Sequence, residues 1–156
     1  MSVSIRQAVA ADAPAMAQLR RRSITELCVA DHGNDPERLG AWLENKTAAR
    51  VAAWIAAPGN HCLVAHLDPA MAGVGLMTAD GEILLCYVDP DARFRGVSAA
   101  LLTALEDRAR TLGLAELRLE ATRTARRFYE ARGFRPQGCA KRAFGTLVCQ
   151  AMAKPL

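Results

Sequence analysis

The stretch Glu82–Leu102 constrains the fold of this chain more than any other. It reads as an apolar strand over Ile83–Val88, a break at Asp89-Pro90, a loop with arginines and a glycine at 93–96, and then a helix. A glycine turn at the start of a helix leaves the first helical amides unpaired and directed outward, where phosphate oxygens can bind. The sequence therefore predicts a protein that holds a phosphorylated ligand on a strand–loop–helix unit.

Hydrophobic periodicity predicts strands and helices on both sides of this unit. Before it we expect a strand at Val3–Val9, a helix after Asp12 that runs toward Val29, short helices at Pro36–Leu43 and Ala48–Ala57, and strands at His61–His66 and Gly73–Ala79. After it we expect a helix at Ser98–Leu112, a strand at Leu114–Ala121, a helix from Thr122 or Thr124 to Gly133, and a closing antiparallel pair at Phe134–Lys141 and Gly145–Met152.

Short polar residues mark the starts of the N-terminal helices. We expect Asp12 to cap the first long helix, Asn34 or Asp35 to cap the next, and Thr47 to cap the one after it. The three arginines at 20–22 are expected on the solvent side of the first helix, although a partner surface stays open for them.

The order of these elements predicts a mixed sheet. Asp80-Gly81 is a two-residue turn of the kind that joins antiparallel strands, so the second, third and fourth strands form a meander. The fourth strand, the helix after it and the fifth strand imply parallel pairing with a right-handed crossover. We expect an α/β fold of the α+β type, with about six to seven mostly antiparallel strands flanked by helices.

Composition narrows the class of protein. The 156 residues, 51% hydrophobic and 23% charged, fit one globular domain over 1–156. The longest uncharged run, Val51–Leu67, contains Pro58 and Gly59, which argues against a membrane span. The five cysteines lack any Cys-x-x-Cys pair, and no apolar block precedes Asp12, so we expect a reduced, cytoplasmic protein without a structural or catalytic metal.

Charge is distributed unevenly along the chain. Residues 91–156 hold 13 Lys and Arg against 6 Asp and Glu, whereas residues 1–90 hold 7 against 10. A basic half is compatible with nucleic acid and equally with a small ligand that carries several phosphates. The basic half is not expected to present interleaved exposed aromatic residues, which argues against nucleic acid.

Two motifs in this arrangement resemble the GNAT superfamily of acetyl-CoA-dependent N-acetyltransferases, and the resemblance covers nearly the whole chain. The family's phosphate-binding signature, Gln/Arg-x-x-Gly-x-Gly/Ala, appears as Arg93-Phe94-Arg95-Gly96-Val97-Ser98. A second pattern, Ala-x-x-Phe-Tyr-x-x-x-Gly-Phe, appears at 125–134. The chain departs from the family at three positions, with Phe94 for a frequent Gly, Ser98 for Gly or Ala, and Thr122 for a frequent Asn.

The resemblance implies that acetyl-CoA is the cosubstrate and that strands four and five splay apart to admit its pantetheine arm. Backbone amides at 94–99 would hold the pyrophosphate, and main-chain groups at 86–88 would pair with the arm like an added strand. The residues expected at the cofactor are Cys86, Tyr87, Val88, Arg93, Phe94, Arg95, Gly96, Val97, Ser98 and Ala99.

The resemblance also implies catalytic roles for two residues. Tyr129 would be the general acid that protonates the departing thiolate, the alternative being an aromatic packed on the sheet. Glu82 would be the base or a water relay for the amine, the alternative being a polar residue that faces water after a turn. Cys86 is expected to pack in the strand rather than to carry an acetyl group.

These features predict direct acetyl transfer from acetyl-CoA to a primary amine within a ternary complex. The alternative is a non-catalytic acyl-CoA-binding sensor or scaffold, which Phe94, Ser98 and Thr122 would favour. The acceptor is expected to be a small-molecule or peptide amine, bound by the insert at 23–60 and the C-terminal hairpin. The acidic residues around His32 are one candidate wall of the acceptor site. The other interpretation is that they lie in an ordinary solvated loop. The family resemblance leaves a homodimer open.

Overall fold

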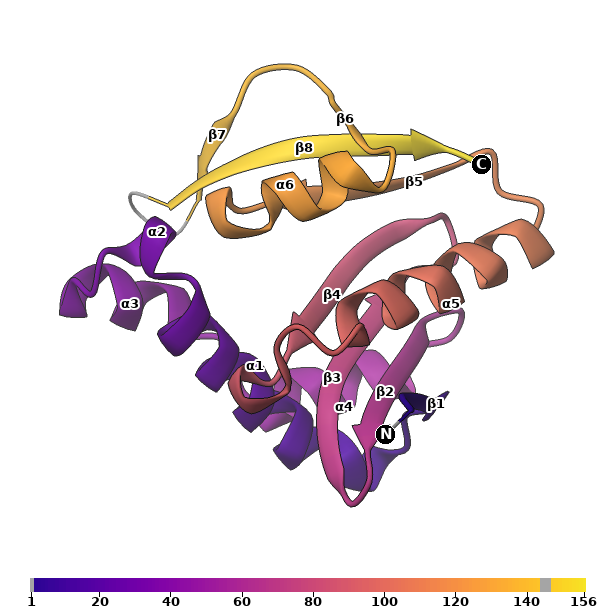
Figure 1. The fold of residues 1–156 in the computed structure, drawn as a ribbon, viewed down its shortest axis with the longest axis horizontal. Coiled ribbons are helices and arrows are strands. Elements are labelled where there is room, and N and C mark those ends of the chain that lie inside the picture. The colour runs from indigo at the N-terminus through magenta and orange to yellow at the C-terminus, as the bar shows by residue number, and fades with distance from the viewer. Residues whose placement is uncertain (1, 144–146) are drawn as a thin grey trace.

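An eight-stranded sheet runs through the molecule in the computed structural model, which describes residues 2–143 and 147–156 (Figure 1). Its order is β1-β2-β3-β4-β5-β8-β6, with β7 paired to β8. The strands are β1 (Ser4–Gln7), β2 (His61–Leu67), β3 (Ala70–Met77), β4 (Glu82–Val88), β5 (Glu116–Ala121), β6 (Arg135–Pro136), β7 (Lys141–Ala143) and β8 (Leu147–Pro155).

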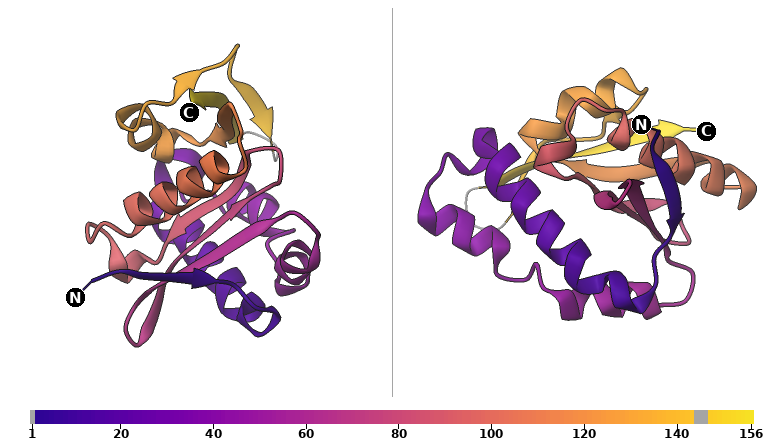
Figure 2. Two further views of the ribbon diagram at one scale, coloured as in Figure 1. Left: turned by 90° about the vertical axis from the view of Figure 1, so that its right-hand side faces the viewer. Right: turned by 60° about the horizontal axis from the view of Figure 1, so that its bottom comes forward.

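Helices cover both faces of this sheet. They are α1 (Ala13–Leu27), α2 (Val29–His32), α3 (Pro36–Leu43), α4 (Ala48–Ala56), α5 (Val97–Thr111) and α6 (Arg123–Ala131), with short 3₁₀ turns η1 (Ala10–Asp12) and η2 (Pro90–Ala92). Figures 1 and 2 show α5 and α6 on one face and α1 with α4 on the other. The predicted α/β fold with a mixed, mostly antiparallel sheet is confirmed.

The two faces have separate cores. On the α5 face, Leu101, Leu105 and Ala109 pack with Leu117 and Phe134, and all five are fully buried. This is the helical stripe that the sequence periodicity predicted for α5. On the α1 face, the buried side chains come from α1, α4 and the central strands. Burial of apolar surface on both faces fixes α1 and α5 against the middle of the sheet.

A glycine allows α5 to approach the sheet closely. A Cβ built on Gly73 in β3 would lie 2.6 Å from Val97 Cγ1 and 2.9 Å from Leu101 Cδ1, both on α5. Any larger residue would push the start of α5 outward. Gly73 therefore fixes the distance between the sheet and the helix start that the sequence predicted as an anion site.

The parallel pair β4–β5 separates along its length. β2, β3 and β4 form the predicted antiparallel meander, and β4 then pairs with β5 at only two positions, Glu82 with Arg118 and Ile83 with Leu119. Beyond Ile83 the two strands diverge, as the family resemblance implied. One edge of the second half of β4 is therefore left without a strand partner.

The C-terminal hairpin differs from the prediction. The continuous strand expected over 134–141 is wrong, because the chain there forms the two short strands β6 and β7, both antiparallel to β8. Pro136 lacks an amide for the ladder and Gly138 takes a left-handed φ of +69°, so the strand breaks between them. β8 extends to Pro155, past the expected end, while the expected strand start at Gly145 lies outside the described residues.

Two of the three predicted helix caps are confirmed. Asp35 accepts from the amide of Glu37 at 3.0 Å, and Thr47 accepts from the amide of Arg50 at 3.2 Å. Asp12 precedes α1 but makes no side-chain cap there. Its carboxylate instead accepts from the amide of Val9 at 2.7 Å and forms an ion pair with Arg6 at 2.8 Å, which joins β1 to the turn before α1.

Candidate active site

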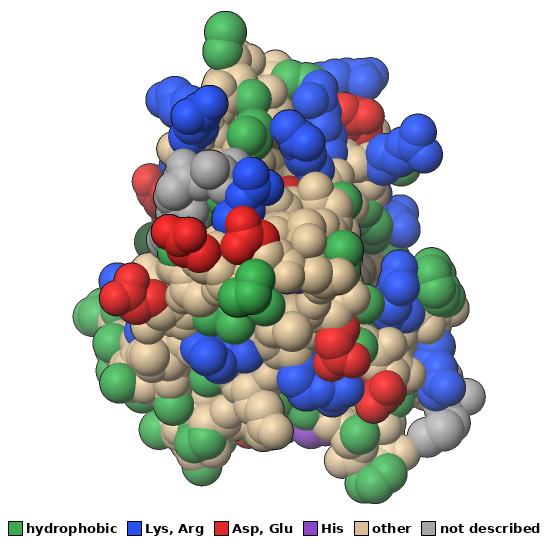
Figure 3. Space-filling model, turned by 90° about the vertical axis from the view of Figure 1, so that its left-hand side faces the viewer, with side chains coloured by type: hydrophobic (Ala, Val, Ile, Leu, Met, Phe, Trp, Pro, Cys, Tyr) green, Lys and Arg blue, Asp and Glu red, His purple; other side chains and the backbone are tan. Residues whose placement is uncertain are grey.

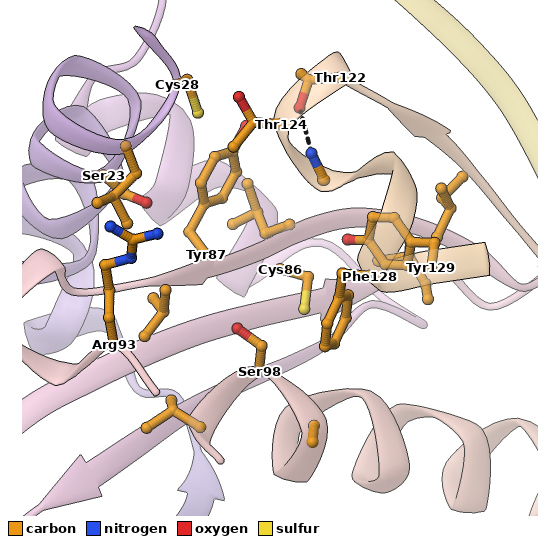
Figure 4. A pocket seen from close by; sticks show the side chains of 18 of the residues that line it. Ser23, Cys28, Cys86, Tyr87, Arg93, Ser98, Thr122, Thr124, Phe128 and Tyr129 are labelled. Atoms are coloured by element: carbon orange, nitrogen blue, oxygen red, sulfur yellow. Dashed lines mark hydrogen bonds between the residues drawn. The ribbon is translucent and has the colours of Figure 1, made fainter. Parts of the chain in front are cut away.

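A cavity of about 530 Å³ opens where β4 and β5 diverge. Its floor is the second half of β4, one wall is the loop and first turn of α5, and the other sides come from β5, the start of α6 and the last turns of α1 (Figure 4). Nine of the ten residues expected at the cofactor line it, and Arg95 does not. The strand–loop–helix unit predicted from the sequence thus forms two sides of one cavity.

The loop before α5 presents main-chain groups to this cavity. Gly96 is the N-cap of α5 with a φ of +79°, and it offers no side chain to cap the first amides. The first intrahelical bond runs from Ala100 N to Gly96 O at 3.0 Å, so the amides of residues 97–99 lie ahead of it. Free amides and the positive end of the helix dipole suit an anion such as a pyrophosphate.

Phe94 keeps the loop conformation that a glycine would favour. Its φ is +62°, and its side chain is 92% exposed. The guanidinium carbon of Arg93 lies 4.6 Å from the centre of its ring. The departure from the family pattern at Phe94 therefore keeps a left-handed residue in the loop with its side chain in solvent, and Ser98 lines the cavity without closing it.

β4 offers a free edge to the cavity. Cys86, Tyr87 and Val88 pair with Gly75, Val74 and Gly73 of β3 on one side. On the other side β5 has already turned away. An extended chain with amide groups, such as a pantetheine arm, can hydrogen-bond along such an edge.

Tyr129 and Cys86 approach each other from opposite sides of the gap between the strands (Figure 4). Burial raises the pKa of the Tyr129 phenol well above its usual value of 10, and the neighbouring Cys86 adds to the rise. Burial also raises the pKa of the Cys86 thiol to about 11, although its hydrogen bond with Tyr129 offsets part of the rise. Both groups are therefore protonated at neutral pH, so Tyr129 has a proton to give and Cys86 is a poor nucleophile.

Glu82 and Tyr129, the two residues expected to be catalytic, do not lie together in the structure. Glu82 lies at the opposite end of β4, in the part still paired with β5, and its side chain is exposed. Its amide donates to Thr78 Oγ1 at 3.1 Å within the turn that precedes β4. Glu82 is not among the residues that line the cavity.

Sequence reasoning missed Glu120 as a site residue. It is the only carboxylate among the described residues that line the cavity, and it extends from the end of β5. The alternation of β5 buries Leu117 and Leu119 and turns Glu116 and Glu120 to the opposite face. That alternation was readable from the sequence, but the point at which β5 leaves β4 was not.

The α1 side of the cavity is mainly apolar. Leu27 and Cys28 line it with Ser23, together with the ring of Tyr87 from β4. Figure 4 shows Tyr87 directed toward Cys28 and Thr124, away from the side of β4 on which Cys86 lies. The two faces of β4 thus border two different parts of the cavity.

Asp31 and His32, in the segment expected either as an acceptor wall or as a solvated loop, make structural contacts. Asp31 accepts from the amide of Arg123 at 2.7 Å and from the amide and hydroxyl of Thr124. His32 is 1% exposed, its Nε2 lies 2.9 Å from Ile24 O, and its Nδ1 accepts from Asn34 N. Neither lines the cavity, because both hold α2 against its neighbours.

Thr122 is occupied as a helix cap. Its hydroxyl accepts from the amide of Ala125 at 3.4 Å, the bond drawn as a dashed line in Figure 4. The residue still lines the cavity. Thr122 therefore fixes where α6 begins and carries Tyr129, two turns on, toward the gap between the strands.

Basic side chains surround the upper part of the molecule in Figure 3, where α6 and β6–β8 lie in Figure 1. Arg93 and Arg132 line the cavity itself. A positive field around a cavity attracts anions and suits a phosphorylated ligand. Within residues 2–143 and 147–156, no group of three or more His, Cys, Asp and Glu is arranged to hold a metal ion.

A family model described as an acetyltransferase (GNAT) domain matches residues 22–156 of this chain. The amino-acid acetyltransferase of Azotobacter vinelandii is 48% identical over 58 residues, which is 37% of this chain. The match covers 13% of that relative, so this chain spans only a small part of its length.

Solved structures match the whole chain. A GCN5-related N-acetyltransferase from Rhodopseudomonas palustris superposes with a TM-score of 0.84 at 28% identity, over 100% of this chain and 97% of that one. The PaiA N-acetyltransferase of Thermoplasma acidophilum, solved in complex with coenzyme A, also has a TM-score of 0.84, at 21% identity and over 100% of both chains.

Proposed function

The chain belongs to the GNAT acetyltransferase family, and on this premise we propose that it transfers the acetyl group of acetyl-CoA directly to the nitrogen of a primary amine. One observation carries the proposal. The divergence of β4 from β5 leaves a free strand edge that leads from the uncapped amides of α5 to the hydroxyl of Tyr129. A long ligand with phosphates at one end, amides along its length and a thioester at the other matches that sequence of groups.

The residues of the cavity fit coenzyme A. The amides at 97–99 and the loop before them would hold the pyrophosphate, and Arg93 would add positive charge. The main chain of residues 86–88 would pair with the pantetheine arm. The coenzyme A complex of the similar Thermoplasma acidophilum protein supports the same cosubstrate. The side chain of Arg95, outside the cavity, would contribute only long-range attraction.

The reaction needs three proton transfers. Only about 0.04% of an alkylamine is neutral at pH 7, so a carboxylate would accept the ammonium proton before the nitrogen attacks the carbonyl carbon. As the new C–N bond forms and the C–S bond breaks, Tyr129 would donate its proton to the sulfur, and the second proton that the nitrogen gives up as it becomes an amide would return to the Tyr129 oxygen. A main-chain amide at the free edge of β4 would stabilise the charge that develops on the carbonyl oxygen.

Two carboxylates compete for the role of base. Glu120 is supported by its position in the lining of the cavity, which Tyr87 and Cys28 also line. Glu82, the residue favoured by its spacing in the sequence, lies at the far end of β4 and would need a chain of waters to reach the amine. We therefore propose Glu120 as the base and retain Glu82 as the second candidate.

The acceptor is proposed to be a small-molecule or peptide amine. The printed name of the Azotobacter vinelandii relative supports an amino acid within that class. We also propose a single domain over residues 1–156 and a cytoplasmic location, which the free thiols of the five cysteines favour. No helix of the part described here has the length and apolar character of a membrane span.

Release of free thiol from acetyl-CoA, followed with a panel of amines, amino acids and peptides, tests the proposal. We expect release that depends on the amine, with acetylated amine as the second product. The alternative is a non-catalytic acyl-CoA-binding module. It predicts that coenzyme A raises the melting temperature while no amine releases thiol, and that result would overturn the proposal.

A further inference from the structure

Phe94 presents its ring to solvent in the loop before α5. It is 92% exposed, more than any other large hydrophobic residue of 2–143 and 147–156, and Val9 comes next at 55%. The other phenylalanines, tyrosines and tryptophans of that part of the chain are buried or half-buried. An exposed phenyl ring keeps apolar surface in water, and a ligand that covers it gains the free energy of burial.

The backbone at Phe94 is unfavourable as well. Its φ of +62° lies in the left-handed region, which bulky residues rarely adopt. Within the described chain only Asn34 shares a positive φ among the residues other than glycine, and asparagine tolerates that region. Residues held in this conformation cluster at active sites and ligand clamps. An unfavourable backbone that carries an exposed ring therefore indicates a ligand contact rather than a contribution to folding.

The position of Phe94 matches one particular part of coenzyme A. Phe94 lines the cavity two residues before Gly96, the N-cap of α5, and the free amides at 97–99 follow. In the proposed complex the pantetheine arm runs from those amides along β4 to Tyr129. The adenosine is joined to the other side of the pyrophosphate, so it extends away from Tyr129 and toward the loop. Phe94 is the aromatic side chain of that loop.

One face of the Phe94 ring is in contact with a cation and the other is free. The guanidinium carbon of Arg93 lies 4.6 Å from the ring centre. None of the ring–ring contacts among residues 2–143 and 147–156 involves Phe94. A purine is a planar π system that stacks on a free phenyl face. Arg95, also exposed, adds a second positive charge beside the ring, which suits a base that carries phosphates.

We propose that Phe94 is a stacking platform for the adenine ring of acetyl-CoA, with Arg93 on the opposite face of the phenyl ring. The inference rests on the proposed use of acetyl-CoA and adds a site for the part of the cosubstrate that the amides and β4 do not reach. Stacking of this kind recognises the base and not the acyl group. Phe94 therefore makes the protein prefer acetyl-CoA over an acetyl group carried on phosphopantetheine alone.

Three ligands separate the parts of the cosubstrate in calorimetric titrations of the full-length protein. Coenzyme A has the base and the 3′-phosphate, 3′-dephospho-coenzyme A keeps the base alone, and 4′-phosphopantetheine has neither. Phe94→Asn removes the ring, and asparagine keeps the left-handed loop. We expect this variant to raise the dissociation constants of the first two ligands by about tenfold or more and that of 4′-phosphopantetheine by less than about twofold.

Phe94→Trp gives a spectroscopic signal from the same position. It should retain the affinity for coenzyme A, because an indole stacks on a base as well as a phenyl ring does. Its added fluorescence should be quenched by coenzyme A and not by 4′-phosphopantetheine, with wild-type protein as the blank, since neither Trp42 nor Trp54 lines the cavity. Leu112→Asn is the matched control. Leu112 is 42% exposed at the other end of α5, outside the cavity, and its replacement should leave all three dissociation constants unchanged.

The possible failures are distinguishable. An equal loss of affinity for all three ligands in Phe94→Asn overturns the platform, because Phe94 then only shapes the loop. Unchanged affinity in Phe94→Asn together with unquenched fluorescence in Phe94→Trp overturns it as well. Absence of coenzyme A binding to the wild-type protein overturns the proposed cosubstrate, and the platform with it. Binding with the expected preference but without thiol release from any amine overturns only the proposed acetyl transfer.

Discussion

The carboxylate of Asp31 accepts a hydrogen bond from the amide of Thr124 at 3.2 Å and another from the hydroxyl of the same residue. Ninety-odd residues separate the two along the chain, yet this contact fastens α2 to the first turn of α6. Thr124 and Thr122 line the cavity there, and Tyr129 is carried by the same helix. The contact therefore joins the N-terminal helices to the proposed general acid.

Replacement of Asp31 by alanine should lower the free energy of unfolding by about 1 kcal/mol, the usual cost of a lost helix cap. It should also raise the KM for the acceptor, because the start of α6 borders the cavity. Asp35→Ala is the matched control, since Asp35 caps α3 away from the cavity. Urea unfolding and steady-state kinetics measure both effects. Equal KM values in the two variants would refute the link.

Tyr129→Phe removes one hydroxyl and keeps the ring contacts with Phe128 and Phe134 at 5.3 and 5.5 Å. We predict that kcat falls by about 100-fold or more, as for loss of a general acid. The dissociation constant of coenzyme A, measured by calorimetry, should change little. Burial raises the pKa of Tyr129 well above 10, so this phenol stays protonated below pH 10. The kcat of the wild-type protein should therefore not fall through deprotonation of Tyr129 in that range. A kcat close to wild type in the variant would remove Tyr129 from the reaction.

The two candidate bases are separated by a pair of variants. Glu120→Gln should lower kcat/KM by about 100-fold at neutral pH and recover partly at higher pH, where more of the amine is already neutral. Glu82→Gln should stay close to wild type, because Glu82 lies outside the cavity. Profiles of kcat/KM against pH for both variants show which carboxylate is the general base. A large loss in Glu82→Gln with Glu120→Gln close to wild type would identify Glu82 as the base.

Cys86→Ala tests whether the thiol carries the acetyl group. Burial holds the Cys86 thiol in its protonated form, with a pKa of about 11, so direct transfer predicts a kcat within about threefold of wild type. A loss as large as that of Tyr129→Phe would indicate a covalent acetyl-cysteine. Steady-state assays of thiol release with acetyl-CoA and the best acceptor measure kcat for wild type, Cys86→Ala and Tyr129→Phe.

Asp12 should make stability depend on acid pH. The hydrogen bond from Arg6 lowers the pKa of Asp12 from 3.8 to about 2 in the folded protein. A depressed carboxyl pKa contributes stability that is present above the unfolded pKa and is lost as the pH falls through the folded one. The advantage of wild type over Asp12→Asn should thus be on the order of 1 kcal/mol above pH 4 and vanish near pH 2. An advantage independent of pH would contradict the ion-pair explanation.

Much of the fold could be predicted from the sequence because local signals agreed with the tertiary structure. The apolar run at 83–88, the helical stripe of α5 and the turn at Asp80-Gly81 each specify a local conformation that the sheet then uses. The break between β6 and β7 could have been predicted from Pro136 and Gly138, whose chemistry is local.

The site was less predictable because it depends on distances through space. The local sequence around Glu82 and around Glu120 does not indicate which of the two lines the cavity. Their positions relative to the cavity follow from the point at which β4 and β5 diverge. Likewise, the arginine triplet at 20–22 reads as a solvated face, and only the packing of α1 against Trp54 and Tyr87 reveals that Arg20 is buried. Asp31 resembled a pocket acid for the same reason, although α6 uses it as a cap.

We propose that acetyl-CoA and the amine meet in the cavity between β4 and β5 and react there in one ternary complex. Initial velocities measured while both substrates are varied distinguish this route from one through an acetylated enzyme. We expect double-reciprocal lines that intersect, as a ternary complex requires. Parallel lines, which indicate an acetylated enzyme between two half-reactions, would contradict it.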